Sequence, residues 1–309
     1  MLRRLIIFGI VTNLCGNNLD INSIKHEFAQ NVLQIGAFKK RYNSYLRKLC
    51  HDDIECYKAT ITQLNSWKQV QEDKKLQNIL KQNLLLQSIQ NDYWNSIVAK
   101  INKTFNLATL KHSQFLSVID LENQKFILTL WDNDFQKLHF IGQDYISSGN
   151  IFRESEIEFG DNHYFKTPSG VFRSKIGWRS DGKLNEDQKT LGYGYKDRYV
   201  FYFGKQKSIR YNTFDQNGTK IDNVDNWKLI VDELEFALHS HKSTKSFGEP
   251  HSHGCIRVSD ELNRFLDNNM VLHKNMLENG TWKAHYTKPP KSPTNIDLAG
   301  EYLIIFDSI

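Results

Sequence analysis

The sequence predicts an α+β protein, in which an all-helical N-terminal region is followed by a mainly β region. No glycine or proline occurs between Gly36 and Gly142, and all five prolines fall at or after Pro168. A run of about a hundred residues without these two breakers is incompatible with turn-rich β structure. From Phe115 onward the apolar residues instead form short runs rich in β-branched and aromatic side chains, which is typical of strands.

The N-terminal segment, residues 1–18, has the pattern of a secretory signal peptide. Arg3 and Arg4 precede an apolar run at residues 5–11, which matches a positive region followed by a short hydrophobic region. Such a run is too short to span a bilayer, which needs about 20 apolar residues. We therefore predict export with no transmembrane span in the mature protein. The residue before Cys15 is too large for a lipid-attachment motif, and an uncleaved anchor or a lipoprotein is the alternative.

Residues 19–110 are predicted to form a helical accessory domain. Lys, Gln and Asn fill the positions between its apolar residues, as on a solvated helix surface. The sequence does not distinguish glycan binding, a protein partner or a lid as the role of this region. The apolar residues that recur at helical spacing are Leu76, Ile79, Leu80 and Leu84, then Tyr93, Ile97, Ile101 and Phe105.

Cys50 and Cys56 are candidates for a disulfide. They flank an acidic segment in which Asp52 or Asp53 suits the N-cap of a following helix. An oxidising compartment would allow the two thiols to pair across a helix corner. The alternative is two reduced cysteines in the core.

Residues 111–280 are predicted to form the second domain, which begins with strands. Residues 115–120 and 125–130 read as a β-hairpin, and residues 138–141 continue it. The segment Thr167–Gly170 places a proline and a glycine in a turn before the next strand. Further strands are expected at residues 198–203 and 234–238.

The C-terminal part should contain one helix, a loop and a last strand. Ser259, Asp260 and Glu261 are suited to cap a helix that ends near Asn269. Residues 281–309 begin as a polar, proline-containing loop and end in an apolar run, residues 301–306, which should add a strand to a sheet.

Composition excludes some classes of function. A chain of 309 residues with 39% hydrophobic residues can bury two cores. The net charge is +5, and lysines are mixed with acidic residues along the whole chain. Nucleic-acid binding domains concentrate basic residues in a patch or stripe, so we expect no nucleic-acid partner. A mildly basic surface suits a substrate rich in carboxylates, although the same charge also serves solubility.

Chemically suggestive residues gather between positions 236 and 258. This stretch holds four of the eleven histidines together with Cys255. A thiolate is a strong nucleophile, and an imidazole is the usual base that creates it. Two histidines could serve as this base. His253 lies two residues before Cys255, whereas His239 ends a strand-like run, and a base on a rigid strand holds its geometry best. Gly254, next to the thiol, would let a carbonyl group approach backbone N–H groups that stabilise an oxyanion.

Two separated signatures carry a resemblance to a known family. The first in the chain is the turn Thr-Pro-Ser-Gly at 167–170. The second is the pair His-Ser at 239–240, followed after a loop by the block Ser-His-Gly-Cys-Ile-Arg at 252–257, and the two signatures occur in the family's order. Together they resemble the L,D-transpeptidase catalytic domain, the YkuD-type family of peptidoglycan enzymes. The resemblance implies a mixed-sheet, sandwich-like catalytic domain that works without a metal or a cofactor.

The resemblance also implies roles for the residues of the site. Cys255 would be the nucleophile, His239 its base, and the Ser240 backbone would orient the imidazole. Members of the family often have glycine in place of Ser240, so this position is a variant. Backbone amides near His253, Gly254 and Cys255 would hold the oxyanion. The expected substrate-binding residues are Arg257, Ser252, Thr167 and Gly170, with fixing of the loop as the other role of Arg257.

The implied reaction takes place on peptidoglycan stem peptides in the periplasm or cell envelope of a bacterium. Cys255 would attack the bond that precedes the terminal D-alanine of a tetrapeptide, and an amine of a second stem would accept the acyl group. Hydrolysis of the same thioester, an L,D-carboxypeptidase reaction, is the first alternative. A non-catalytic cell-wall-binding protein is the second.

Two rival chemistries use the same residues. His239, His241, His251, His253 and Cys255 are all possible zinc ligands. Zinc motifs rarely place a glycine and an arginine beside the thiolate, so we expect no metal. A papain-like peptidase has its cysteine far ahead of its histidine in the chain, which is the reverse of the order here.

Overall fold

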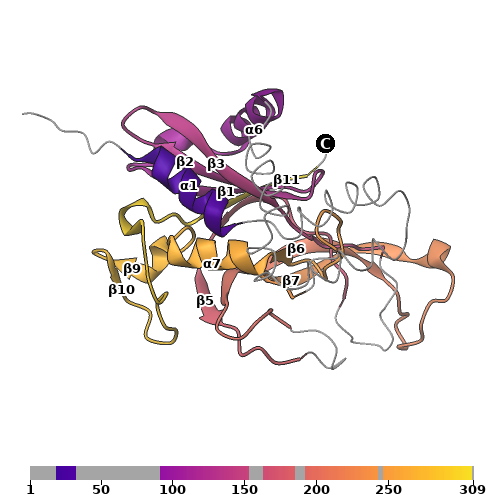
Figure 1. Ribbon diagram of the computed structural model, residues 1–309. Helices are drawn as coiled ribbons and strands as arrows, with labels where there is room; N and C mark the ends of the chain where they lie inside the picture. The colour runs from indigo at the N-terminus through magenta and orange to yellow at the C-terminus, as the bar shows by residue number, and fades with distance from the viewer. Residues whose placement is uncertain (1–18, 33–90, 153–162, 185–191, 243–245, 308–309) are drawn as a thin grey trace, which may run out of the picture.

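The computed structural model describes residues 19–32, 91–152, 163–184, 192–242 and 246–307 (Figure 1). The predicted signal peptide, the helical run at residues 76–84 and the candidate disulfide of Cys50 and Cys56 lie outside these ranges.

The described strands form two main sheets, and both sheets are mixed. The first has the order β3-β2-β1-β11-β4, with β11 parallel to β1 and every other pair antiparallel. The second has the order β5-β6-β7-β8, with only β7 and β8 parallel. This confirms the predicted mixed-sheet β domain. The strands of the first sheet are β1 (Gln114–Asp120), β2 (Lys125–Asp132), β3 (Lys137–Tyr145), β4 (Gly170–Arg173) and β11 (Tyr302–Phe306).

The second sheet is dominated by one long hairpin. β6 and β7 are paired from Phe201 opposite Leu238 to Asn212 opposite Lys228, so the hairpin continues well past the residues predicted as strands. It extends to the right in Figure 1 as an arm. The strands of this sheet are β5 (Ile176–Arg179), β6 (Tyr199–Asn212), β7 (Lys228–Ser240) and β8 (Ile256–Val258), and a separate small hairpin consists of β9 (Leu277–Glu278) and β10 (Thr281–Trp282).

The main core contains side chains from both sheets. Because side chains alternate along a strand, each strand gives the core every second residue. Phe115 and Ile119 of β1, Phe201 of β6 and Leu238 of β7 belong to one buried apolar cluster. The predicted sandwich-like arrangement therefore holds for the part of the chain that the structure describes.

The helix α7 (Asp260–Asn268) confirms the helix predicted after the nucleophile block. Its N-cap is Ser259, whose hydroxyl accepts a hydrogen bond from the N–H of Leu262. Asp260 and Glu261 lie in the first turn, where the helix dipole favours negative charge. Phe265 and neighbouring apolar residues of α7 enter the main core, so the helix closes one side of it.

The helix α1 (Ile21–Asn31) packs into the core of the β domain, although the sequence assigned it to a separate accessory domain. Phe28 is fully buried and its ring lies 5.0 Å from the ring of Phe265. A Cβ at Gly142 of β3 would lie 2.2 Å from the Phe28 ring, so the glycine makes room for the helix. The helix α1 is therefore part of the β domain's own packing.

The helix α6 (Asn91–Thr104) covers the outer face of the first sheet, and its apolar spacing was predicted. Ile97 and Ile101 are fully buried against a second apolar cluster, which includes Val118 of β1 and Ile127 of β2. The tyrosine hydroxyl of Tyr93 donates a 2.7 Å hydrogen bond to Asp120 at the end of β1. This helix ties the predicted helical region to the first sheet.

The last strand, β11, lies inside the first sheet. It pairs with β1 on one side and β4 on the other, so it is not an edge strand. Four of its five residues are buried. A strand this close to the C-terminal end is thus required to complete the sheet.

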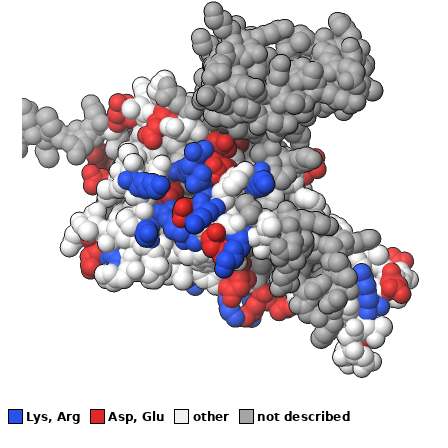
Figure 2. Space-filling view, turned by 60° about the horizontal axis from the view of Figure 1, so that its bottom comes forward, with Lys and Arg blue, Asp and Glu red and all other residues white. Residues whose placement is uncertain are grey.

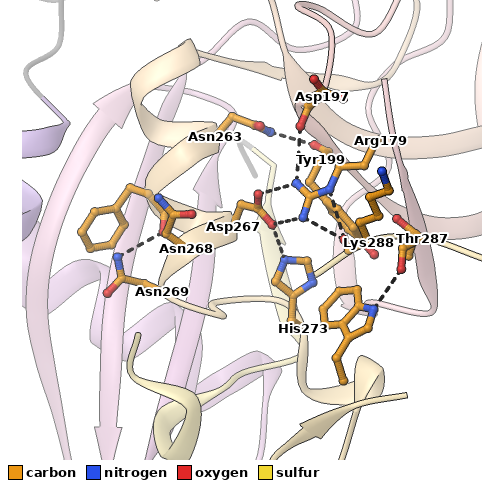
Figure 3. Close-up of polar contacts among 12 residues, drawn as sticks. Arg179, Asp197, Tyr199, Asn263, Asp267, Asn268, Asn269, His273, Thr287 and Lys288 are labelled. Carbon is orange, nitrogen blue, oxygen red and sulfur yellow. Dashed lines mark hydrogen bonds and ion pairs between the residues drawn. The ribbon is translucent and has the colours of Figure 1, made fainter. Parts of the chain in front are cut away.

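A buried ion pair joins β5 to the end of α7 (Figure 3). The guanidinium of Arg179 contacts both carboxylate oxygens of Asp267, with 3.1 Å between Nη2 and Oδ1, and also donates to the carbonyl of Lys288. Asp267 in turn lies 2.9 Å from Nε2 of the fully buried His273. These contacts fix β5, the strand that carries Trp178.

Charges of both signs are mixed on the described surface. Figure 2 shows a face where Lys and Arg side chains gather, with Asp and Glu side chains between them. Charge pairs such as Arg198 with Asp260 and Arg173 with Glu301 account for part of this mixing. None of the described helices is long and apolar enough to cross a membrane.

Candidate active site

His239 lies near the end of β7, and Cys255 directly precedes β8, the parallel neighbour of β7. Leu238 pairs with Ile256, and both side chains belong to the main core. Because side chains alternate along a strand, His239 points away from this core, to the other face of the sheet. The Tyr193 ring lies 5.3 Å from the His239 ring, and burial, followed by the charge of Cys255, raises the pKa of Tyr193. The predicted base and the predicted nucleophile are therefore both neighbours of Tyr193.

The imidazole of His239 is held in one tautomer. Its Nδ1 atom lies 2.9 Å from the carbonyl oxygen of Ser240. A carbonyl oxygen can only accept, so Nδ1 carries the proton and Nε2 is left as the basic nitrogen. This is the orienting contact that was expected from the Ser240 backbone. Burial, and then the positive charge of Arg257, lowers the pKa of His239 to about 3, so the ring is neutral at physiological pH.

The thiol of Cys255 is half-buried and protonated in this arrangement. Its Sγ atom lies 3.4 Å from the carbonyl oxygen of Glu235, to which the thiol donates. Burial raises the pKa of Cys255 to about 11, against the opposing effects of the Ala237 backbone and the Arg257 charge. The resting site therefore holds a neutral thiol beside a neutral imidazole. Proton transfer requires the thiol hydrogen to rotate away from Glu235.

The loop before the nucleophile is closed by the hydroxyl of Ser252. This hydroxyl donates to the carbonyl of Cys255 and accepts from the N–H of Gly254 at 3.1 Å. Ser252 is 1% exposed, so its side chain shapes the loop and does not face a substrate. The N–H of Gly254 was expected to face the oxyanion, and in this structure it is directed at Ser252 instead.

Gly254 itself is required by the loop. Its φ of +128° lies where side chains are rarely tolerated, and a Cβ would lie 2.8 Å from the side chain of Leu234. The close packing of Leu234 and Phe165 around this glycine holds the backbone of the nucleophile loop.

Thr167, in the segment just before β4, stabilises the nucleophile loop through its hydroxyl. Its hydroxyl donates a 2.7 Å hydrogen bond to the carbonyl of Gly254 and accepts a 2.8 Å hydrogen bond from the N–H of Gly149. The residue is 2% exposed. The hydroxyl thus donates one hydrogen bond and accepts another within the protein. These contacts favour a role in supporting the loop over the substrate contact that was expected. Gly170, the other residue expected from this turn, starts β4 opposite Ile305.

Replacing Thr167 by Val is expected to lower the free energy of unfolding by about 2–6 kcal/mol. The change keeps the side-chain shape but leaves two buried backbone groups without a partner, each costing about 1–3 kcal/mol. Urea denaturation of the purified protein measures the effect. Thr167→Ser, which keeps the hydroxyl, is the matched control. An unfolding curve of Thr167→Val that coincides with that of the unchanged protein would contradict the assignment.

Arg257 fixes the loop and sets the charge of the site. The Nη1 atom of its guanidinium donates to the carbonyl of His251 at 3.3 Å. The backbone N–H of Arg257 donates to the carbonyl of Ser147, and its carbonyl accepts from the N–H of Ser147. Its positive charge lowers the pKa of both His239 and Cys255. Of the two roles considered for Arg257, these contacts favour fixing of the loop.

Two further histidines of the motif, His253 and His241, have defined contacts in the structure. The ring of His253 stacks edge-on against Tyr164 at 4.1 Å, and its carbonyl accepts from the N–H of Phe165. His241 is buried, and its N–H donates to the carbonyl of Val258. Among the described residues, no group of three or more His, Cys, Asp or Glu is arranged to hold a metal ion.

Sequence reasoning missed an aromatic and acidic wall beside the thiol. Trp178 of β5 contacts Tyr193 at 5.4 Å and Tyr202 of β6 at 5.8 Å, and Tyr193 lies 5.3 Å from the His239 ring. The carboxylate of Glu235 accepts a hydrogen bond from the Tyr202 hydroxyl. One feature of the sequence could have predicted the position of Glu235. Side chains alternate along a strand, so Glu235 and His239, four residues apart on β7, lie on the same face.

Comparison with known families gives one match. The model of the L,D-transpeptidase catalytic domain, YkuD, matches residues 114–282. This range includes the thiol, the imidazole, the Thr167 turn and the aromatic wall. A comparison with curated proteins gives no match.

Solved structures of similar proteins are distant. L,D-transpeptidase LdtMt1 in complex with imipenem is 13% identical, with 63% of this chain and 59% of that chain covered and a TM-score of 0.28. Bd1075 of Bdellovibrio bacteriovorus is 15% identical, with 63% and 49% covered and a TM-score of 0.29. L,D-transpeptidase 3 from Mycobacterium tuberculosis is 13% identical, with 63% and 61% covered and a TM-score of 0.27. The chain thus spans less than two thirds of the length of each of these proteins.

Proposed function

Because the chain belongs to the L,D-transpeptidase catalytic-domain family, we propose that it is a cysteine-dependent acyltransferase acting on peptidoglycan stem peptides. The observation that supports this proposal is the parallel pairing of β7, which carries His239, with β8, which Cys255 directly precedes. The Nδ1 atom of His239 faces the Ser240 carbonyl, so Nε2 is the basic nitrogen of the proposed mechanism.

Acylation begins with proton transfer from the thiol to Nε2 of His239. The sulfur attacks the carbonyl carbon between the L centre of diaminopimelate and the terminal D-alanine. The C–N bond of the resulting tetrahedral intermediate then breaks, and the proton on Nε2 passes to the amine of the departing D-alanine. The product is a thioester on Cys255 and a neutral His239.

The oxyanion of the intermediate needs hydrogen-bond donors. Since the N–H of Gly254 is directed at Ser252, we assign this role to the backbone N–H of Cys255 and to the surrounding loop. Removal of one such donor typically costs about 10²- to 10³-fold in kcat. Arg257 adds a fixed positive charge near the reacting atoms without a direct contact to them.

The neutral resting pair suits this chemistry. A thiolate formed in advance would need a strongly lowered pKa, whereas burial raises the pKa of Cys255. Deprotonation is therefore coupled to attack, with His239 as a general base that is already neutral. Peptidoglycan lies outside the cytoplasm, so the proposed activity agrees with the export predicted for residues 1–18.

The test is incubation of the purified protein with a disaccharide tetrapeptide, with the products identified by mass spectrometry. A crosslinked dimer that has lost one D-alanine is the expected product of transpeptidation. Release of tripeptide alone identifies the L,D-carboxypeptidase alternative, which uses the same thioester. Absence of both products would reject the proposed enzyme class.

A further inference from the structure

The face that carries the thiol also carries an exposed carboxylate. Glu235 is two positions before Ala237 and four before His239 on β7, so all three side chains point to the same side of the sheet. Its side chain is 59% exposed, and its backbone carbonyl accepts the thiol hydrogen of Cys255. A negative charge therefore lies beside the reacting sulfur and in contact with solvent.

Aromatic rings surround this carboxylate. The Tyr202 hydroxyl donates to Oε2 of Glu235, and the Tyr202 ring contacts Trp178, which in turn contacts Tyr193. Burial raises the pKa of Tyr193, and the negative charges that Cys255 and Glu235 carry when ionised raise it further, which shows how near these groups lie to one another. Arg179, the neighbour of Trp178 on β5, holds that strand through its ion pair with Asp267 (Figure 3).

A carboxylate is poorly suited to the acyl donor. Stem peptides carry carboxylates, and a negative charge next to the sulfur repels them. Burial is the main cause of the raised pKa of Cys255, and the Glu235 charge adds to it. The group that a carboxylate flanked by aromatic faces attracts is a cation, through charge pairing and cation–π contact. The diaminopimelate of the donor also carries an ammonium group, but the primary ammonium of the acceptor is the cation that must reach the thioester carbon.

We propose that Glu235, together with the rings of Trp178, Tyr193 and Tyr202, forms the subsite that captures the primary ammonium group of the acceptor and guides it to the thioester. This inference rests on the proposed function and specifies which residues favour the amine over water. Glu235 is the specificity-determining residue of the subsite, and the three rings form its wall.

The proton balance of the transfer step is complete. The acceptor ammonium gives one proton to solvent through the Glu235 carboxylate and becomes a free amine. The amine nitrogen bonds to the thioester carbonyl carbon and passes a second proton to Nε2 of His239. The C–S bond then breaks, and the proton on His239 returns to the sulfur of Cys255. The products are the amide crosslink and the free thiol.

The same strand offers a matched control. Glu233 lies two residues before Glu235 on the same face, and its side chain is 62% exposed. Lys205 of β6 is near both carboxylates, 3.3 Å from Glu233 and 3.8 Å from Glu235. The two residues thus share exposure, charge and a lysine neighbour. They differ in that the Glu235 backbone contacts the thiol and its carboxylate contacts Tyr202.

The test measures how the thioester divides between amine and water. An isotopically labelled disaccharide tetrapeptide serves as donor and an unlabelled disaccharide tripeptide as acceptor, and mass spectrometry gives the ratio of crosslinked to hydrolysed labelled acyl groups. Both products come from one thioester, so the ratio is independent of the rate of acylation. Glu235→Gln is expected to lower this ratio about fivefold, the size expected for an exposed charge pair. Glu233→Gln should keep it within about twofold.

The salt dependence of the product ratio is a second measurement. It would not change if Glu235 acted only by supporting the fold. Raising NaCl from about 20 to about 500 mM should lower the ratio for the unchanged protein and bring it close to that of Glu235→Gln, because exposed charges are screened. Equal ratios for the unchanged protein and Glu235→Gln at low salt, with both products formed, would overturn the subsite and leave the enzyme class intact. Tripeptide as the sole product at every acceptor concentration would also overturn it. Absence of both products rejects the proposed function itself.

Discussion

Cys255→Ala is expected to abolish both crosslinked and hydrolysed products, with a fall in turnover of roughly 10⁴-fold or more, because no other group can form the thioester. Cys255 is the only cysteine among the described residues, and its sulfur contacts the backbone carbonyl of Glu235 on β7, the strand that carries the proposed base His239. Mass spectrometry of the intact protein provides a direct measurement. The unchanged protein should gain the mass of the tripeptide acyl group in the presence of donor, and Cys255→Ala should gain nothing.

The control for this variant is its stability. Cys255 is half-buried, and loss of one sulfur at such a site should change the free energy of unfolding by about 1 kcal/mol or less. Urea denaturation of both proteins would show that the site, and not the fold, has been lost. A folded Cys255→Ala protein that still produced tripeptide or dimer at more than about one part in a hundred of the normal rate would contradict the nucleophile assignment. Unchanged products would favour the non-catalytic cell-wall-binding alternative.

The sequence identified the family because the residues that carry the resemblance are local. His239 and Cys255 lie sixteen residues apart, so the strand that ends at His239 and the glycine turn before Cys255 are both found in one short stretch of the chain. The hairpin of β1 and β2 and the helix α7 were also predicted, since alternation and capping are read from neighbouring residues. The turn at Thr167 was found as well, but the direction of its hydroxyl was not, because its partners Gly149 and Gly254 come from other segments.

The features that the sequence did not predict depend on contacts between distant segments. The helix α1 reads as an ordinary amphipathic helix, and only the space above Gly142 shows that Phe28 belongs to the β domain. The strand β5 is four residues long and has no periodic pattern, so Trp178 could not be assigned to the site. The residues around Glu235 come from separate segments: Trp178 from β5, Tyr202 from β6 and Tyr193 from the loop before β6. They become neighbours only when the second sheet forms.

Replacing His239 by Ala is expected to lower turnover by about 10²- to 10⁴-fold, the range that a general base contributes. His241→Ala is the matched control, because that residue is also a buried histidine of the same strand end, with a backbone hydrogen bond to Val258. It should keep most of the activity. Equal losses in the two variants would mean that His239 acts through the fold and not as the base.

The pH dependence distinguishes this site from one with a preformed thiolate. The pKa of His239 is lowered to about 3, so the imidazole remains neutral as the pH falls below 6.5. We therefore expect kcat/KM to stay constant from neutral pH down to about pH 4.

Alkylation of the thiol gives a second measurement. The pKa of Cys255 is raised to about 11, so the rate of alkylation by iodoacetamide should increase from pH 7 to pH 10 without a plateau. In a thiolate–imidazolium pair, loss of the histidine would slow alkylation at neutral pH. Here His239→Ala should leave alkylation nearly unchanged while turnover collapses, and an alkylation plateau near neutrality would contradict the neutral pair.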